Sequence, residues 1–289
     1  MNHLRALSGI ALLFCAGPAA ALDLGRMVQG LDVNKVVEIG SRLNASTVEM
    51  AVPEEIALGR DLAARILGAA PALPDPEIQA YVNRIGRWLT LHTERPELPW
   101  HFAVAATDTV GAFATPGGNV IITAGLLQLM RDENELAGVL AHEISHVVHR
   151  HHTQAIMKRA RAELATDIAT ELAQQYVAKN PLVTQALMST GMNLYASGLD
   201  QQDEFAADRN GIIIAARAGY DPLGLVYLLT TLDSVGASEP RTQLMFSTHP
   251  PTRERIDRLA AVADMVPATG SLRDTQRFAT LQARLLGPR

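Results

Sequence analysis

The chain has 289 residues, of which 48% are apolar, 19% charged and only 4% aromatic. This composition is typical of a globular protein and excludes a disordered or collagen-like chain. The formal net charge of -5 and the sequence pI of about 6.0 carry no electrostatic signature for a polyanion, so nucleic acid is not expected as a partner.

The first residues have the features of a secretory signal peptide. A short segment that carries Arg5 precedes the apolar run Leu7–Ala16, and small residues follow it. The run of about ten residues is shorter than the roughly 20 that span a bilayer, which favours cleavage over a membrane anchor. The only cysteine, Cys15, lies inside it. We predict a signal peptide, residues 1–21, and one periplasmic domain, residues 22–289, that is not an integral membrane protein.

Helix-start signals and alternating apolar residues predict the next elements in chain order. Two helices are expected to begin at Pro53 and Asp75 and to end near Leu67 and Leu91. Three strands are expected at Trp100–Ala106, Ala112–Thr115 and Asn119–Thr123, with a hairpin between the last two. A capping-box pattern from Asp132 to Glu135 then begins a helix with an apolar stripe. The fold class that follows is α+β, mostly α-helical, with a small sheet of about three strands beside this helix.

The helix after Asp132 carries the sequence His142-Glu143-Ile144-Ser145-His146. Residues four apart project from one helical face, so the two imidazoles can bind one metal ion. A catalytic zinc ion takes three protein ligands and a water, and Glu143 can accept the proton of that water. Because a chain with this many histidines has such a pattern by chance in roughly one or two of every hundred cases, two surface histidines without a metal remain the alternative.

Two acids four residues apart, Glu204 and Asp208, follow further along the chain. On a helix they share one face. Glu204 can then be the third ligand, and Asp208 can accept the free ring N–H of a ligating histidine, which fixes its tautomer. Taken alone, the polar surroundings of this pair favour a solvated helix face.

Together these motifs resemble the HtpX-like and CAAX-prenyl-protease-like zinc metalloendopeptidases, a gluzincin group with His-Glu-x-x-His followed by Glu-x-x-x-Asp. The resemblance covers about Ile56–Leu259. Further matches in the same order are Ala112–Gly118, Gly125–Leu127, Glu135–Ala141, Ala218–Pro222 and Thr248–Thr252. The resemblance implies that one Zn²⁺ ion is held by His142, His146 and Glu204, and that Glu143 is the catalytic base. We expect the compact secreted branch of the group.

Two positions depart from the pattern of the group. Its members usually have Asn before the Ala-Phe-Ala segment and Arg three residues before the third ligand, whereas this chain has Gly111 and Gln201. Neither residue is an expected ligand or the base. We expect the two departures to affect how precisely the wall of the active site and Glu204 are positioned.

Two further elements are expected to act on the substrate. From the resemblance and from its place before Asp132, one strand is expected to be an edge strand that pairs with an extended peptide. This strand consists of Asn119, Val120, Ile121, Ile122 and Thr123. His249 lies in a loop where the resemblance also has His-Pro. It can donate to the developing oxyanion or reach the metal in a closed resting state, or the loop can simply lead into the next helix.

The neighbouring histidines are not expected to bind the metal. His149 is predicted to support a ligand or lie at the surface. His151 and His152 are predicted to form, with Arg150, a solvated and partly basic helix end. The uncharged segment Asn180–Leu199 is too polar for a membrane span and is expected to be a buried amphipathic helix.

These features predict a zinc-dependent metalloendopeptidase that acts on unfolded or misfolded proteins in envelope quality control, with at most peripheral membrane association. The alternative is a chaperone-like protein that binds unfolded envelope proteins and does not cleave them. A structural zinc protein is a weaker alternative, because structural sites usually have four protein ligands rich in Cys and the mature chain has none.

Overall fold

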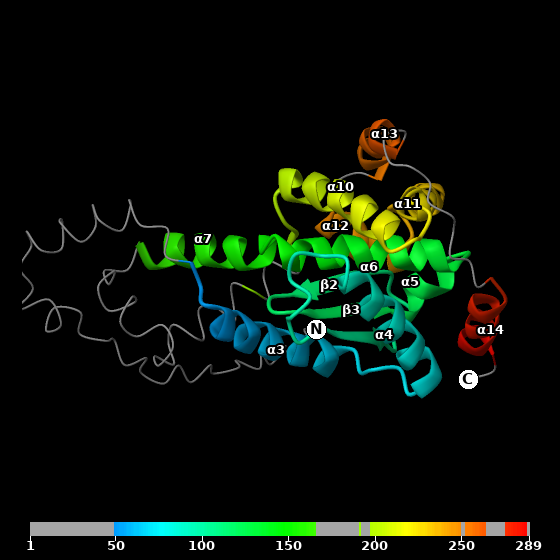
Figure 1. The fold of residues 1–289 in the computed structure, drawn as a ribbon, viewed down its shortest axis with the longest axis horizontal. Coiled ribbons are helices and arrows are strands. Elements are labelled where there is room, and N and C mark those ends of the chain that lie inside the picture. The colour runs from blue at the N-terminus through cyan, green and yellow to red at the C-terminus, as the bar shows by residue number, and fades with distance from the viewer. Residues whose placement is uncertain (1–48, 166–190, 192–196, 250–251, 264–274, 288–289) are drawn as a thin grey trace, which may run out of the picture. The chain divides into compact units, whose positions relative to one another are not determined.

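A small sheet with helices on both faces makes up the described part of the chain (Figure 1). The computed structural model describes residues 49–165, 191, 197–249, 252–263 and 275–287. These residues are mostly helical and include three strands, which confirms the predicted α+β class. Within them, no helix has both the length and the apolar character needed to span a membrane. The expected signal peptide and the predicted domain start at residue 22 lie outside the described residues.

The first two described helices begin at the predicted signals. They are α3 (Val52–Ala69) and α4 (Pro76–Thr90). The Asp75 carboxylate caps α4 by accepting hydrogen bonds from the backbone N–H groups of Glu77 at 3.0 Å and Ile78 at 3.1 Å. A proline in the first turn of each helix has no N–H group that would need a partner.

The sheet has the order β1-β3-β2. Strand β1 (His101–Ala105) runs parallel to β3 (Asn119–Thr123), and β2 (Ala112–Thr115) pairs with β3 antiparallel through a turn in which Gly117 and Gly118 have positive φ. Strand β3 is therefore central, and the prediction that Asn119–Thr123 is an edge strand is wrong. The physical reason is that β1 pairs with the side of β3 that the hairpin leaves open.

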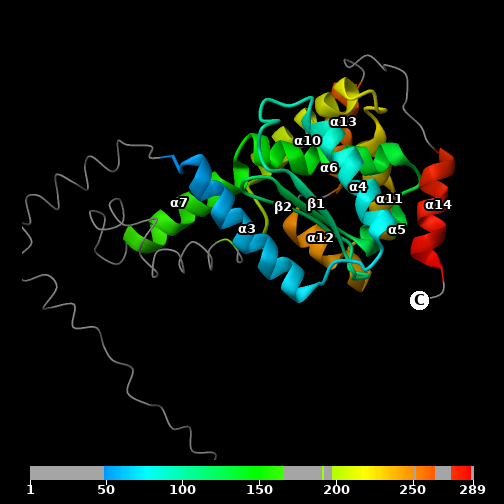
Figure 2. The same cartoon turned by 60° about the horizontal axis from the view of Figure 1, so that its bottom comes forward.

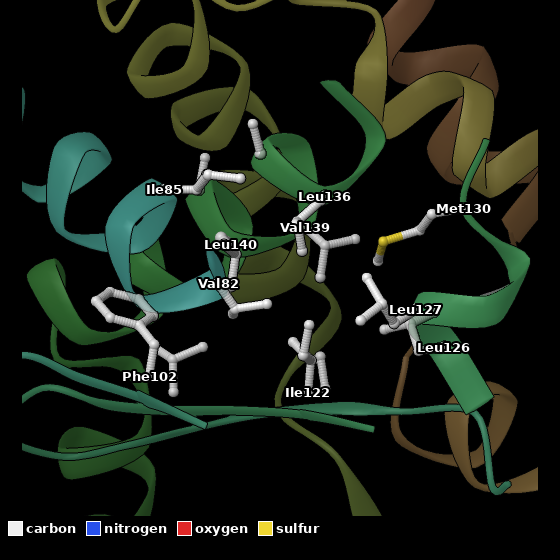
Figure 3. Packing of buried hydrophobic residues seen from close by; sticks show 14 of the residues in the cluster. Val82, Ile85, Phe102, Ile122, Leu126, Leu127, Met130, Leu136, Val139 and Leu140 are labelled. Carbon is white, nitrogen blue, oxygen red and sulfur yellow. The ribbon is translucent and has the colours of Figure 1, made fainter. Parts of the chain in front are cut away.

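Side chains alternate across the sheet and divide the apolar core into two layers. Ile122 of β3 and Phe102 of β1 point toward α4 and α6 (Glu133–Val148), where they approach Leu140 (Figure 3). Ile121 points the other way and packs with apolar residues of α3. Helix α3 accordingly covers the face of the sheet opposite to α4 and α6 (Figure 2).

Helix α6 lies at the centre of the fold. It packs against the sheet and α4 on one side and against α10 (Gln201–Arg217) and α11 (Gly224–Val235) on the other, so nearly all of its residues are buried (Figure 1). Asp132 caps it by accepting a hydrogen bond from Glu135 N at 3.2 Å. The Glu135 carboxylate accepts hydrogen bonds from the backbone N of Arg131 at 2.9 Å and from Arg131 Nε at 2.7 Å. Because it does not bind the backbone N of Asp132, only half of the expected capping box is present.

Glycines allow close packing on both neighbours of α6. A Cβ atom at Gly138 would lie 2.5 Å from the backbone N of Leu225 in α11. A Cβ atom at Gly211 of α10 would lie 3.0 Å from the backbone N of His142. A side chain at either position would force the helices apart. The second contact brings α10 close to the motif on α6.

The remaining described elements flank this centre. They are α5 (Ala124–Leu129), α7 (His151–Ala165), the 3₁₀ helix η1 (Pro240–Thr242), α12 (Gln243–Thr248), α13 (Thr252–Ala263) and α14 (Thr275–Leu286). Helix α13 packs on α10 and α11, and α14 packs on α5. Most of the segment Asn180–Leu199, which was predicted to be a buried helix, lies outside the described residues.

Candidate metal centre

Three side chains of the types that bind metals converge between α6 and α10. His142 Nε2 lies 3.1 Å from His146 Nε2 and 3.6 Å from Glu204 Oε2, and His146 Nε2 lies 3.5 Å from Glu204 Oε1. All three side chains are buried. The four-residue spacing places the imidazoles on one face of α6, and the packing of α10 brings the carboxylate to them. The structure thus brings together the three residues expected to be ligands.

The donor atoms fit a tetrahedral metal ion. Ligand atoms about 2.0–2.1 Å from such an ion lie about 3.4 Å apart, close to the observed 3.1, 3.5 and 3.6 Å. Within the described residues, the buried Glu204 Oε2 atom has no hydrogen-bond partner. A buried carboxylate oxygen is costly unless a donor or a cation compensates it. Two imidazoles and one carboxylate are also a known ligand set of catalytic zinc sites.

Glu143 lies next to the converging donors and is buried. A carboxylate oxygen of Glu143 and ring nitrogens of His142 and His249 all lie within 4.8 Å of one another. Burial raises the pKa of Glu143 to about 7, although the charge of His142 and a backbone hydrogen bond from Ala114 of β2 lower it. A carboxyl group with a pKa near neutrality can both accept and return a proton.

Asp208 contacts the other ring nitrogen of His142. Asp208 Oδ1 lies 3.0 Å from His142 Nδ1, and Arg255 of α13 donates to Asp208 through Nε at 2.9 Å and Nη2 at 2.6 Å. Burial acts to raise the pKa of Asp208, but Arg255 and His142 outweigh it and hold the pKa well below its usual range. The charged carboxylate orients His142 so that Nε2 faces Glu204. Arg255 is not recognisable from the sequence, because its partner is set by the packing of α13 on α10.

His151 is buried and His152 is half-buried beside His146, which corrects the prediction of a solvated helix end. His151 Nδ1 lies 3.0 Å from His146 Nδ1, and the ring centroids of His152 and His146 are 5.3 Å apart. Burial lowers the pKa of His151 to about 4 and that of His152 to about 3. The prediction failed because Arg150 has a φ of 59°, so α7 starts in a new direction and the helical wheel of α6 does not apply.

His149 lies apart from the converging donors, as expected. It ends α6, and its Nδ1 atom lies 3.0 Å from the Ser145 carbonyl oxygen. Its Nε2 atom lies 3.2 Å from Asn210 Nδ2 of α10.

His249 follows α12 and faces the converging donors. Its Nε2 atom lies 3.7 Å from Glu204 Oε2, and its ring centroid is 5.8 Å from that of His142. The Nδ1 atom lies 3.2 Å from the Met245 carbonyl oxygen, a contact that orients the ring. Burial lowers the pKa of His249 and so favours the neutral imidazole.

A partly open pocket leads to these groups. Its wall consists of Ala112, Phe113, Glu143, His146, His152, Gly198, Leu199, Glu204, Thr248 and His249. Of the two departures from the group pattern, Gly111 precedes β2 and accepts a hydrogen bond from Thr123 N at 3.0 Å. Gln201 donates to Glu254 of α13 at 2.8 Å. Gly111 therefore lies directly before a strand of the pocket wall, and Gln201 lies at the start of the helix that carries Glu204.

The chain belongs to Peptidase family M48, which residues 75–263 match. It is 29% identical over 274 residues to the beta-barrel assembly-enhancing protease of Escherichia coli (strain K12), a match that covers 93% of this chain and 55% of that protein. It is 28% identical over 265 residues to the metalloprotease YcaL of the same strain, covering 86% of this chain and 97% of YcaL. It is 28% identical over 179 residues to the mitochondrial metalloendopeptidase OMA1 of Schizosaccharomyces pombe, a match that covers 62% of this chain and 51% of OMA1. The chain thus spans about half the length of the beta-barrel assembly-enhancing proteases that it matches.

Proposed function

We propose that this chain is a zinc-dependent metalloendopeptidase. The observation that carries the proposal is the convergence of His142, His146 and Glu204 beside the buried Glu143. Membership of Peptidase family M48 supports it. One zinc ion per chain would be held by the two imidazoles and the Glu204 carboxylate.

The residues around this centre have separate tasks in the proposed reaction. Bound zinc supplies a Lewis acid that polarises the substrate carbonyl and lowers the pKa of water to about 7. Glu143 accepts the proton of the attacking water while the water oxygen bonds to the carbonyl carbon. Glu143 then delivers a proton to the amine nitrogen as the C–N bond breaks. The ion pair between Asp208 and Arg255 keeps His142 in the orientation that this geometry needs.

The substrate strand is expected to pair with β2. Strand β2 is at the edge of the sheet and packs against α6. Its residues Ala112 and Phe113 form part of the pocket wall. An extended peptide can add to such an edge through main-chain hydrogen bonds. This mode of binding places few demands on substrate side chains, which suits unfolded proteins as substrates.

The proposed location is the periplasm. The signal-like sequence of residues 1–21 supports it, as does the similarity to a protein named a beta-barrel assembly-enhancing protease. We propose envelope proteins that are unfolded or misfolded as the substrates, and residues 22–289 as a single mature domain.

His249 is proposed to occupy the open metal position at rest. Its Nε2 atom lies 3.7 Å from Glu204 Oε2, close to the spacing of about 3.4 Å expected for neighbouring zinc ligands. His249→Ala should therefore keep its metal and turn over faster. If the closed state holds about nine molecules in ten, the gain in turnover is about tenfold. The measurements are kcat, kcat/KM and metal content of both proteins.

Other outcomes of this substitution have distinct meanings. A fall in kcat of about 100-fold with metal retained would assign His249 to the oxyanion instead. Unchanged kcat and kcat/KM in a folded variant would contradict both roles and leave only a loop that leads into α13. His101→Ala serves as a control, because this exposed histidine at the start of β1 lies outside the pocket wall.

Metal removal tests the proposed function itself. Treatment with a strong chelator is expected to abolish cleavage of unfolded casein, and addition of Zn²⁺ is expected to restore it, because the ion supplies both activation of the water and polarisation of the carbonyl. Full cleavage after complete metal removal would contradict the proposal. Wild-type protein that binds unfolded casein but never cleaves it, with metal present, would favour the chaperone-like alternative.

A further inference from the structure

The two histidines of the metal centre are supported in different ways. His142 Nδ1 lies against the Asp208 carboxylate at 3.0 Å. His146 Nδ1 instead lies 3.0 Å from another imidazole nitrogen, Nδ1 of His151. We infer that His151 is the positioning residue of His146, accepting its Nδ1–H and holding its Nε2 toward the metal. This inference rests on the proposed role of His146 as a metal ligand.

A bound metal ion sets the direction of this hydrogen bond. The ion takes the lone pair of His146 Nε2, so the ring proton is on Nδ1 and this atom is the donor. His151 Nδ1 must then be the acceptor, which places the proton of His151 on its own Nε2. That Nε2 atom faces Asp203 Oδ1 at 4.0 Å, so a carboxylate lies on the side that bears the proton. One tautomer of each ring thus makes the 3.0 Å hydrogen bond between the two Nδ1 atoms and turns the N–H of His151 toward a carboxylate.

The chain between α6 and α7 is arranged to hold His151 in this place. Arg150 has a φ of 59°, the left-handed conformation that L residues rarely adopt. Its Nε atom lies 3.3 Å from Glu55 Oε2, and Glu55 also binds Arg95 at 3.1 and 3.0 Å. Arg95 further donates to the Val147 carbonyl oxygen at 3.1 Å. This cluster, in which Glu55 is buried and both arginines are half-buried, fixes the turn that directs His151 back toward the last turn of α6.

The two supports differ in charge, which predicts unequal contributions. Asp208 is a carboxylate and adds negative charge behind His142, whereas a neutral imidazole behind His146 adds only an acceptor. Loss of His151 should therefore lower metal affinity, because His146 is no longer held in its orientation. The loss should be near the lower end of the range of about 10- to 100-fold that is usual for such supporting groups. A side chain that can accept a hydrogen bond should restore much of the loss.

The test compares three variants of the full chain. His151→Leu removes the acceptor, and His151→Gln keeps a carbonyl acceptor. His149→Leu is the control at the same helix junction, because the His149 ring stacks on His151 with centroids 5.6 Å apart but makes its polar contacts with Ser145 and Asn210. The readouts are the Zn²⁺ dissociation constant, by chelator competition, and the visible spectrum of the Co²⁺-loaded protein. We expect affinity about tenfold weaker and an altered spectrum for His151→Leu, recovery in His151→Gln, and wild-type behaviour in the control. Wild-type affinity and spectrum in His151→Leu, or equal losses in all three variants, would overturn the inference.

A second measurement needs no variant and so does not depend on the folding of His151→Leu. Nitrogen-15 NMR of the histidines in zinc-loaded wild type should show His146 Nδ1 protonated, His151 Nδ1 unprotonated and a coupling between the two nitrogens across the hydrogen bond. A proton on His151 Nδ1 would overturn the inference. Wild-type protein that binds no metal would instead contradict the proposed function, and these outcomes are distinguishable.

Discussion

Glu204→Ala is expected to lose its metal, whereas Asp208→Ala should keep it with an affinity about 10- to 100-fold lower. The reason is that a Glu204 oxygen lies among the converging donors, 3.5 Å from His146 Nε2. Asp208 instead lies 3.0 Å from Nδ1 of His142, the ring nitrogen that does not face these donors. Removal of Glu204 leaves only His142 and His146 as protein ligands whenever His249 leaves the open metal position, which is too few for a catalytic zinc site. The measurement is metal content after dialysis against a mild chelator.

The Asp208 variant needs a control for folding. Arg255 is only 3% exposed, so Asp208→Ala leaves a buried cation without its carboxylate and is expected to lower stability. Asp208→Asn keeps the volume and one acceptor, and thermal unfolding of each metal-free variant separates instability from weak metal binding. Equal metal content in wild type, Glu204→Ala and Asp208→Ala would refute the assignment of Glu204.

Glu143→Gln is expected to bind metal normally and to lower kcat by about 10²- to 10⁴-fold, the usual contribution of a general base. Gln has nearly the same shape as Glu but cannot accept the proton of water. The burial that raises the pKa of Glu143 to about 7 places this carboxyl in the range where proton transfer is efficient at neutral pH. The measurement is kcat on unfolded casein, together with metal content.

A matched control for this substitution lies on the same helix. Glu135 is also a buried carboxylate of α6, but it binds Arg131 and does not line the pocket. Glu135→Gln should therefore keep kcat near that of the wild type. A Glu143→Gln variant within about tenfold of wild-type kcat would show that another group accepts the proton.

Local signals in the sequence predicted the elements well. The bounds of β2 and β3 agree with the prediction, because a hairpin is specified by its own turn residues and by alternating apolar side chains. The N-cap residues Asp75 and Asp132 likewise mark the starts of α4 and α6. Helical spacing also explains why His142 and His146 share a face, since a period of 3.6 residues is set by the backbone alone.

Features that depend on packing between distant segments were not predictable in this way. Strand β3 is central because β1 pairs with it in parallel, and neither strand sequence specifies that partner. His151 turns toward His146 because Arg150 is left-handed although it is not glycine. Arg255 of α13 binds Asp208 of α10, and these two helices are far apart in sequence.

Hydrolysis of a peptide bond by this chain can be followed by mass spectrometry, because the attacking water leaves its oxygen in the product. Unfolded casein is incubated in ¹⁸O-labelled water with metal-loaded wild type or with Glu143→Gln. Only the wild type is expected to release new peptides, and each new C-terminal carboxylate is expected to carry an oxygen atom from the labelled water. Casein that remains intact while bound to the metal-loaded wild type would show that this chain is not a peptidase.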